Sequence, residues 1–153
     1  MLKPIALATL ISGTLDILFA TILTLLNARE PANMLRFVAS GPFPSAPEMG
    51  TSGAILGLIV HFALMAIMAT VFVAVTRARP ALLKSPVLTG VGYGLITYVI
   101  LDLIVVPLRF PAAFPPKPIS IATQLFAHIV LVGLAFAFIA RRYLPARVAN
   151  ASQ

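Results

Sequence analysis

The chain has 153 residues, of which 60% are hydrophobic and 10% are charged. A soluble domain usually carries about 25% charged residues, so this composition excludes an ordinary soluble protein. The chain contains no cysteine, which excludes disulfides, thiolate metal sites and thiol chemistry. The net charge of +7 comes from basic residues at the ends of apolar segments, an arrangement typical of membrane anchoring and not of nucleic-acid binding.

Four apolar segments are each long enough to cross a bilayer core about 30 Å thick, which needs about 20 helical residues. They predict an all-α polytopic membrane protein, with residues 1–153 forming a single four-helix domain. The first segment runs on past Asp16 and is too long for the apolar part of a cleaved signal peptide. Prolines bracket the later segments. They fit helix boundaries, because the residue before a proline disfavours helical geometry. The predicted spans are Pro4–Asn27, Gly53–Val75, Val87–Val106 and Ile119–Ala140.

The distribution of lysine and arginine predicts the orientation, since the more basic side of a membrane protein faces the cytoplasm. The side that holds both termini and the link 76–85 carries Lys3, Arg77, Arg79, Lys84, Arg141, Arg142 and Arg147. The opposite side carries Arg29, Arg36, Arg109 and Lys117, diluted by Glu30 and Glu48. We therefore expect both termini to be cytoplasmic.

The two loops on the opposite side differ in their predicted structure. In the first, Pro31–Ser40 is amphipathic enough to form a short helix at the membrane interface. The second, Pro107–Pro118, is rich in proline and is expected to be extended. The spans themselves contain no interruption that would mark a substrate site in a transporter.

The two halves of the chain, about 1–80 and 81–147, share several short patterns. Leu35-Arg36-Phe37 in the first loop matches Leu108-Arg109-Phe110 in the second, and Leu58-x-x-His61-x-x-Leu64 matches Leu125-x-x-His128-x-x-Leu131. These matches indicate an internal duplication of a helical hairpin. Because both halves run in the same direction, the repeat would be parallel, with its axis along the membrane normal.

Each predicted span carries one ionisable residue: Asp16, His61, Asp102 and His128, in chain order. An aspartate at the centre of a span costs about 2.5–3.5 kcal/mol on insertion scales, so such residues face the bundle interior and find partners there. We therefore expect the four side chains to share one buried polar centre. Tyr98 and Gln124 lie on the same predicted faces and are further candidates.

Helical spacing supports this placement, because residues three or four apart share one face of a helix. The predicted buried stripes combine small residues with one polar group, and the GxxxG pairs within them allow backbones to approach closely. The stripes are Thr9, Gly13, Asp16, Ala20, Thr24 and Asn27; Gly53, Gly57, His61, Met65 and Met68; Gly90, Gly94, Tyr98 and Asp102; and Gln124, His128, Val132 and Ala135.

Three hypotheses for the function follow from the polar centre. The first is a non-enzymatic accessory, scaffolding or ligand-binding protein, whose partners are the bilayer and another membrane protein or further copies of itself. The second is a haem b protein, with His61 and His128 as axial ligands and with Arg36 and Arg109 near the propionates. The third is proton-coupled or cation transport, in which histidines exchange protons with Asp16 or ligate a divalent cation. No cofactor is expected under the first hypothesis.

An enzyme is not expected, because the sequence contains no HExxH motif, phosphate loop or recognisable nucleophile motif. One resemblance covers most of the chain. Gly13-Thr14-Leu15-Asp16, Val38-Ala39-Ser40-Gly41, Pro86-Val87-Leu88-x-Gly90-x-x-Tyr93-Gly94 and the two histidines resemble a family of small bacterial inner-membrane proteins. The resemblance implies four spans and an inner-membrane location, and it implies no particular activity.

Overall fold

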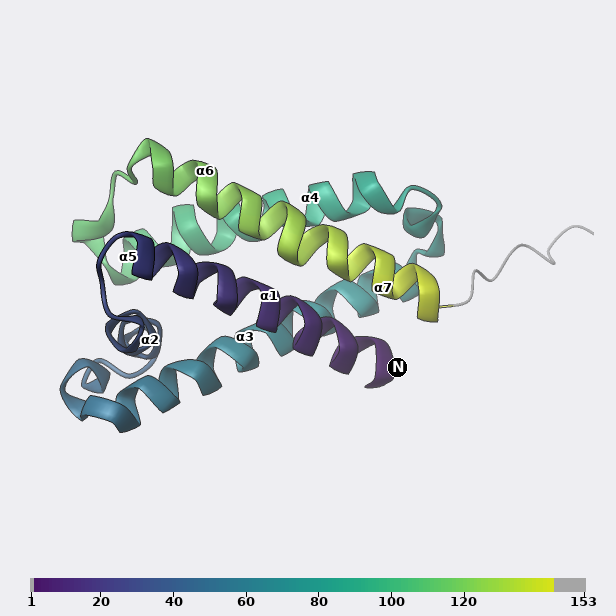
Figure 1. Ribbon diagram of the computed structural model, residues 1–153. Coiled ribbons are helices and arrows are strands. Elements are labelled where there is room, and N and C mark those ends of the chain that lie inside the picture. The colour runs from purple at the N-terminus through teal and green to yellow at the C-terminus, as the bar shows by residue number, and fades with distance from the viewer. Residues whose placement is uncertain (1, 145–153) are drawn as a thin grey trace, which may run out of the picture.

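The computed structural model describes residues 2–144, and all regular secondary structure within them is helical (Figure 1). The prediction of four membrane-spanning helices is confirmed by length and apolar composition. The spans are Leu2–Leu26, Ala46–Ala78, Pro86–Arg109 and Pro118–Tyr143. Arg147, one of the basic residues predicted on the side that holds the termini, lies outside the described residues.

The first half of the chain forms α1 (Leu2–Leu26), α2 (Pro31–Ser40), the 3₁₀ turn η1 (Ala46–Met49) and α3 (Gly50–Ala78). A second 3₁₀ turn, η2 (Pro80–Lys84), leads into the other half. Span three consists of α4 (Pro86–Tyr98), the π-helical segment η3 (Val99–Val105) and α5 (Val106–Arg109). After the 3₁₀ turn η4 (Pro111–Ala113), span four consists of α6 (Pro118–Phe126), the π-helical segment η5 (Ala127–Leu134) and α7 (Ala135–Tyr143).

Prolines begin many of these elements. A proline is the first residue of α2, η2, α4, η4 and α6. The first turn of a helix has backbone N–H groups without a helical partner, so the N–H that proline lacks is not missed there. The same property explains why the predicted loop helix Pro31–Ser40 and α2 have identical bounds.

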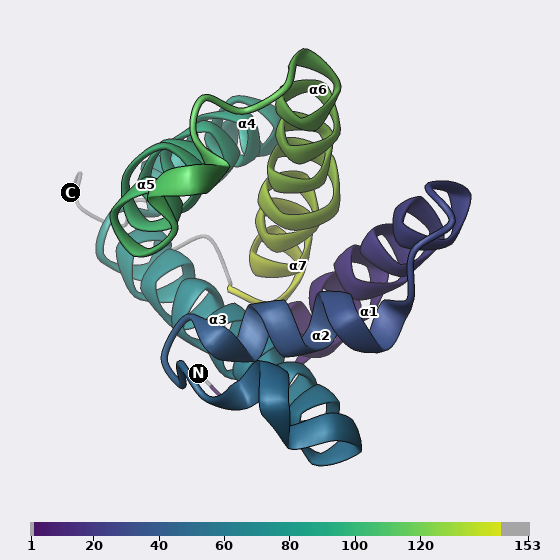
Figure 2. The same ribbon diagram turned by 90° about the vertical axis from the view of Figure 1, so that its left-hand side faces the viewer.

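The spans form two hairpins that lie against each other. Figure 1 shows α1 crossing α3, and α1 contacts α3, η5 and α7. We call the end that carries α2, η1 and η4 the loop end, and the end that carries Leu2, η2 and Tyr143 the terminal end. At the loop end, α2 lies across the bundle and contacts α1 and α3 (Figure 2).

The terminal half of the bundle is packed with apolar side chains. Phe72 and Phe136 are almost fully buried, with their ring centroids 5.9 Å apart. The hydroxyl of Tyr93 donates a 2.7 Å hydrogen bond to the Met68 carbonyl and so ties α4 to α3. Many large apolar side chains, such as Leu10 and Ile67, are exposed, as expected where lipid surrounds the helices.

The two predicted GxxxG pairs both mark close backbone approaches. A Cβ atom on Gly94 would lie 2.6 Å from the Cα atom of Ile129, so α4 can pack on η5 only because residue 94 lacks a side chain. A Cβ atom on Gly57 would lie 3.0 Å from the Cα atom of Leu35. The glycines of α3 therefore accommodate the loop helix α2 and not another span.

One expectation from the sequence was wrong. The loop after Pro107 was expected to be extended, but α5 continues to Arg109 and η4 follows it. Pro107 lies in the first turn of α5, where its missing N–H is tolerated. Spans three and four are continuous helices, and each contains a π-helical segment, η3 and η5, that the sequence did not indicate.

Candidate functional site

The most direct polar contact inside the spans joins Asp102 to His128. The Nε2 atom of His128 lies 3.0 Å from the Oδ2 atom of Asp102, and less than a fifth of either side chain is exposed. Asp102 belongs to η3 and His128 to η5, so both partners lie in π-helical segments. π-helical turns are rare, and they occur frequently at functional sites.

The other ring nitrogen of His128 contacts a hydroxyl group. Its Nδ1 atom lies 2.9 Å from Oγ1 of Thr97, and the same hydroxyl lies 3.0 Å from the carbonyl oxygen of Gly94. A hydroxyl has a single proton, so it can donate to only one of these two acceptors at a time. When Thr97 donates to Gly94, His128 Nδ1 must carry a proton. When Thr97 donates to His128, Nδ1 must be unprotonated.

A second aspartate–histidine pair joins the first two spans. The Nε2 atom of His61 lies 2.9 Å from the carbonyl oxygen of Gly13, and its Nδ1 atom lies 3.9 Å from Oδ2 of Asp16. A carbonyl can only accept a hydrogen bond, so Nε2 of His61 carries a proton. Its Nδ1 atom is left facing the carboxyl group.

The four ionisable residues of the spans form two pairs, Asp16–His61 in the first hairpin and Asp102–His128 in the second, which we together call the polar centre. Asp16 interacts electrostatically with His61 and also with His128 and Asp102. The helix α1, which carries Asp16, packs against η5, which carries His128. Within residues 2–144, no group of three or more histidine or carboxylate side chains is arranged to hold a metal ion. The contacts of the centre described above are ion pairs and hydrogen bonds.

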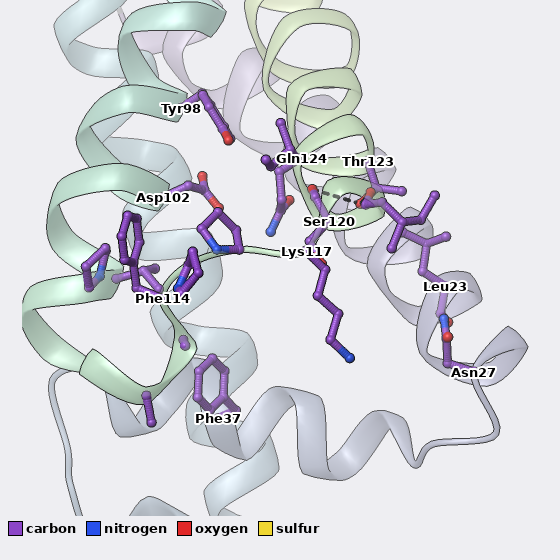
Figure 3. Close-up of a pocket in the computed structure, with 18 of the residues that line it drawn as sticks. Leu23, Asn27, Phe37, Tyr98, Asp102, Phe114, Lys117, Ser120, Thr123 and Gln124 are labelled. Carbon is purple, nitrogen blue, oxygen red and sulfur yellow. Dashed lines mark hydrogen bonds between the residues drawn. The ribbon is translucent and has the colours of Figure 1, made fainter.

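A cavity of about 760 Å³ opens at the loop end and reaches down to Asp102. The cavity brings together Tyr98, Asp102 and Gln124, all three of which the sequence analysis singled out. Figure 3 shows the side chains of Asp102, Gln124 and Lys117 projecting into the same space from three different segments. The polar centre is thus connected to one surface of the bundle.

The residues around the cavity provide both signs of charge and several aromatic rings. Among the described residues that line it, Asp102 is the one carboxylate. The basic side chains are Arg29 and Lys117, both exposed, and the aromatic side chains are Phe37, Tyr98 and Phe114. The sequence analysis did not identify Thr97, Lys117 or Phe114 as site residues.

The two arginines proposed as propionate ligands bind backbone carbonyls instead. Arg109 donates from Nε to the carbonyl of Gly41 at 2.9 Å and from Nη2 to the carbonyl of Ser40 at 2.8 Å. Arg36 donates from Nη1 to the carbonyl of Gly50 at 3.2 Å. Arg109 therefore fastens the end of span three to the last turn of α2, beside the ring contact between Phe37 and Phe110.

The arrangement does not fit axial ligation of a haem. An axial histidine needs one ring nitrogen directed at the iron. In this structure both ring nitrogens of His61 and both of His128 face protein oxygen or hydroxyl groups. Each histidine is paired with an aspartate of its own hairpin, and none of these contacts joins one histidine to the other.

No protein-family model matches the chain, and no similar protein was found among curated sequences or among solved structures.

Proposed function

We propose that this protein is an integral membrane protein that binds a small organic ammonium compound carrying an acidic group. The cavity at the loop end is the binding site. The observation that carries the proposal is the position of Asp102, which lines the cavity and is at the same time ion-paired to His128. This develops the ligand-binding form of the accessory-protein hypothesis.

The inner end of the cavity, where Asp102 lies, favours a positively charged group on the ligand. Asp102 is the carboxylate there, and its Oδ2 atom faces His128, which leaves the lone pairs of the second oxygen for a ligand. Tyr98 and Phe114 add aromatic faces, which attract ammonium groups by about 0.5–2 kcal/mol. A compact organic cation satisfies both kinds of contact.

The mouth of the cavity favours an acidic group. Arg29 and Lys117 are both exposed and both line the cavity, so a bare cation would meet two positive charges on its way in. A ligand with its ammonium group at Asp102 and a carboxylate toward the mouth removes this conflict. The volume of about 760 Å³ lies within the range of roughly 300–1,000 Å³ that is usual for small-molecule sites.

The distribution of lysine and arginine favours an orientation in which the loop end faces the outer side of the membrane. The ligand would then reach the cavity from outside the cytoplasm. Apolar side chains around Phe72 and Phe136 fill the terminal half of the bundle and separate the polar centre from the terminal end. This packing supports access of a ligand from the loop end alone.

Equilibrium binding to the purified protein in detergent tests the proposal. The probes are glycine betaine, which carries both charges, tetramethylammonium, which carries the positive one, and acetate, which carries the negative one. We expect glycine betaine to bind most tightly and acetate not to bind. Asp102→Asn should weaken both cationic probes about tenfold to a hundredfold, the range for a lost charge-assisted contact. Lys117→Gln should weaken glycine betaine more than tetramethylammonium.

Glu48→Gln is the matched control, because it removes one carboxylate from the same end of the bundle without touching the cavity lining. Its affinities should equal those of the unaltered protein. Absence of binding of all three probes, or equal losses in Asp102→Asn and Glu48→Gln, would contradict the proposal.

Proton-coupled transport is a second candidate, favoured by the second aspartate–histidine pair, Asp16 with His61, because α1, which carries Asp16, packs against η5, which carries His128. In liposomes, flux of radiolabelled glycine betaine should depend on an imposed pH gradient. Asp16→Asn should remove that dependence while the protein stays folded. Equal pH-dependent flux in both proteins would count against transport and leave the binding proposal standing.

A further inference from the structure

We infer that the site is a proton–cation exchanger: an ammonium group that binds at Asp102 expels one proton from the Asp102–His128 pair. The inference rests on the proposed function for its ligand class, and it adds a chemical step that ligand binding alone does not require. The structural basis is the chain of contacts that runs from the cavity through Asp102 and His128 to Thr97 and ends at the Gly94 carbonyl.

This chain of contacts supports two complete hydrogen-bond patterns. In the first, His128 is an imidazolium that donates from Nε2 to Asp102 and from Nδ1 to Thr97, and Thr97 donates to Gly94. In the second, His128 is a neutral imidazole that still donates from Nε2 to Asp102, while Nδ1 accepts the Thr97 proton. Thr97 has both acceptors within 3.0 Å, so it can serve either state by rotating its hydroxyl.

The cation selects between the two patterns by charge. In the first pattern, the imidazolium neutralises the Asp102 carboxylate. An ammonium group at Asp102 supplies a second positive charge next to the same carboxylate, and two like charges at this separation repel strongly where the dielectric constant is low. Loss of the Nδ1 proton of His128 to the solvent relieves the repulsion, and both ring nitrogens stay hydrogen-bonded, Nε2 to Asp102 and Nδ1 to the Thr97 hydroxyl.

The exchange balances in atoms and charge. One ammonium group enters, one proton leaves to water, and no bond other than the N–H bond of His128 breaks. By linkage, the coupling is reciprocal, so a proton on His128 weakens cation binding by the same factor by which the cation favours proton release.

Other ionisable groups approach the Asp102–His128 pair from the elements packed around it. From α4, the ring of Tyr98 lies with its centroid 6.0 Å from that of His128. From α1, Asp16 interacts electrostatically with the pair, and it is itself paired to His61 of α3. In the cavity, Lys117 and Arg29 approach from the loop and from the end of span one. Asp102 itself forms its ion pair with His128.

Proton release on addition of tetramethylammonium tests the inference, because this probe has no proton of its own to lose. The protein is held in weakly buffered detergent solution, and a pH electrode records protons released per cation bound at several pH values. We expect release to approach one proton per cation at acidic pH. The tetramethylammonium affinity should then rise with pH, by up to about tenfold per pH unit.

Two sets of variants identify the source of the proton. In His128→Gln, the amide can still contact Asp102 but cannot titrate, so release should fall to zero and the affinity should no longer depend on pH. Thr97→Val removes the rotating hydroxyl and should reduce the release, whereas Thr97→Ser keeps the hydroxyl and should restore it. The Thr97 comparison stays informative even if His128→Gln fails to fold.

The possible failures are distinguishable. If tetramethylammonium binds without releasing protons, the exchange is wrong and the binding proposal survives. If release persists unchanged in His128→Gln, the proton comes from another group and the inference is overturned. If neither tetramethylammonium nor glycine betaine binds, the proposed function itself is wrong.

Discussion

Gly94 and His128 are in contact through the polar network and also through their backbones. The Gly94 carbonyl accepts the hydrogen bond of the Thr97 hydroxyl that touches His128 Nδ1, and the His128 carbonyl carbon lies 2.8 Å from where a Cβ atom on Gly94 would be. The packing of α4 against η5 and the geometry of the Asp102–His128 pair are therefore set by the same glycine.

Gly94→Ala should both destabilise the protein and disturb the site. The added methyl group would overlap the backbone of η5, and overpacking of this kind costs typically about 1–3 kcal/mol. Gly92→Ala is the matched control on the same helix, because its Cβ atom would meet nothing within 4 Å. Thermal unfolding in detergent should show a lower midpoint for Gly94→Ala and an unchanged or higher one for Gly92→Ala. Equal midpoints would mean that α4 and η5 are not in close backbone contact.

Arg109→Ala should loosen the last turn of α2. The guanidinium occupies the carbonyls of Ser40 and Gly41 with two hydrogen bonds, and a planar fork of donors makes both at once. Hydrogen–deuterium exchange should increase for peptides covering residues 37–43. Arg109→Lys should recover only part of the protection, because an ammonium group cannot reproduce the fork. Unchanged exchange in Arg109→Ala would show that this contact does not hold α2.

Both termini should face the cytoplasm, as the distribution of lysine and arginine predicts. The chain has no cysteine, so a single introduced thiol reports its own location without background. Ser45→Cys, in the first loop, should react with a membrane-impermeant maleimide added outside intact cells. Ser85→Cys, in the link between the halves, should react only after the membrane is opened. The reverse labelling pattern would place the cavity on the cytoplasmic side.

Haem should not bind as a bis-histidine complex. The ring nitrogens of His61 and His128 face Gly13, Asp16, Thr97 and Asp102. Addition of haemin to the purified protein should therefore give no Soret band of a six-coordinate haem. A band that disappears in both His61→Ala and His128→Ala would show that the two imidazoles can turn toward a common iron.

The amino-acid sequence by itself determined the class of the molecule. The length and the apolar composition of four segments predict the spans, because a helix that is solvated by lipid needs enough apolar residues to cross the bilayer and does not need a particular order of them. The bounds of α2 followed from Pro31 and from its amphipathic pattern. The stripe through His61 was predicted from helical spacing, and Gly53, Gly57, His61, Met65 and Met68 are all buried. The internal duplication stays a prediction.

Only the tertiary structure decided how the polar residues are paired. Thr97 and Asp102 are five residues apart, a spacing that separates two side chains on an ordinary α-helix, yet both contact His128. Thr97 lies in the last turn of α4 and Asp102 in the π-helical segment η3 that follows it, and the wider turns of a π-helix change the face on which Asp102 lies relative to Thr97. Nothing in the local pattern of span three indicates that segment. The cavity also joins residues far apart in the chain, from α1, span three, the second loop and α6, and such a juxtaposition exists only once the hairpins pack together.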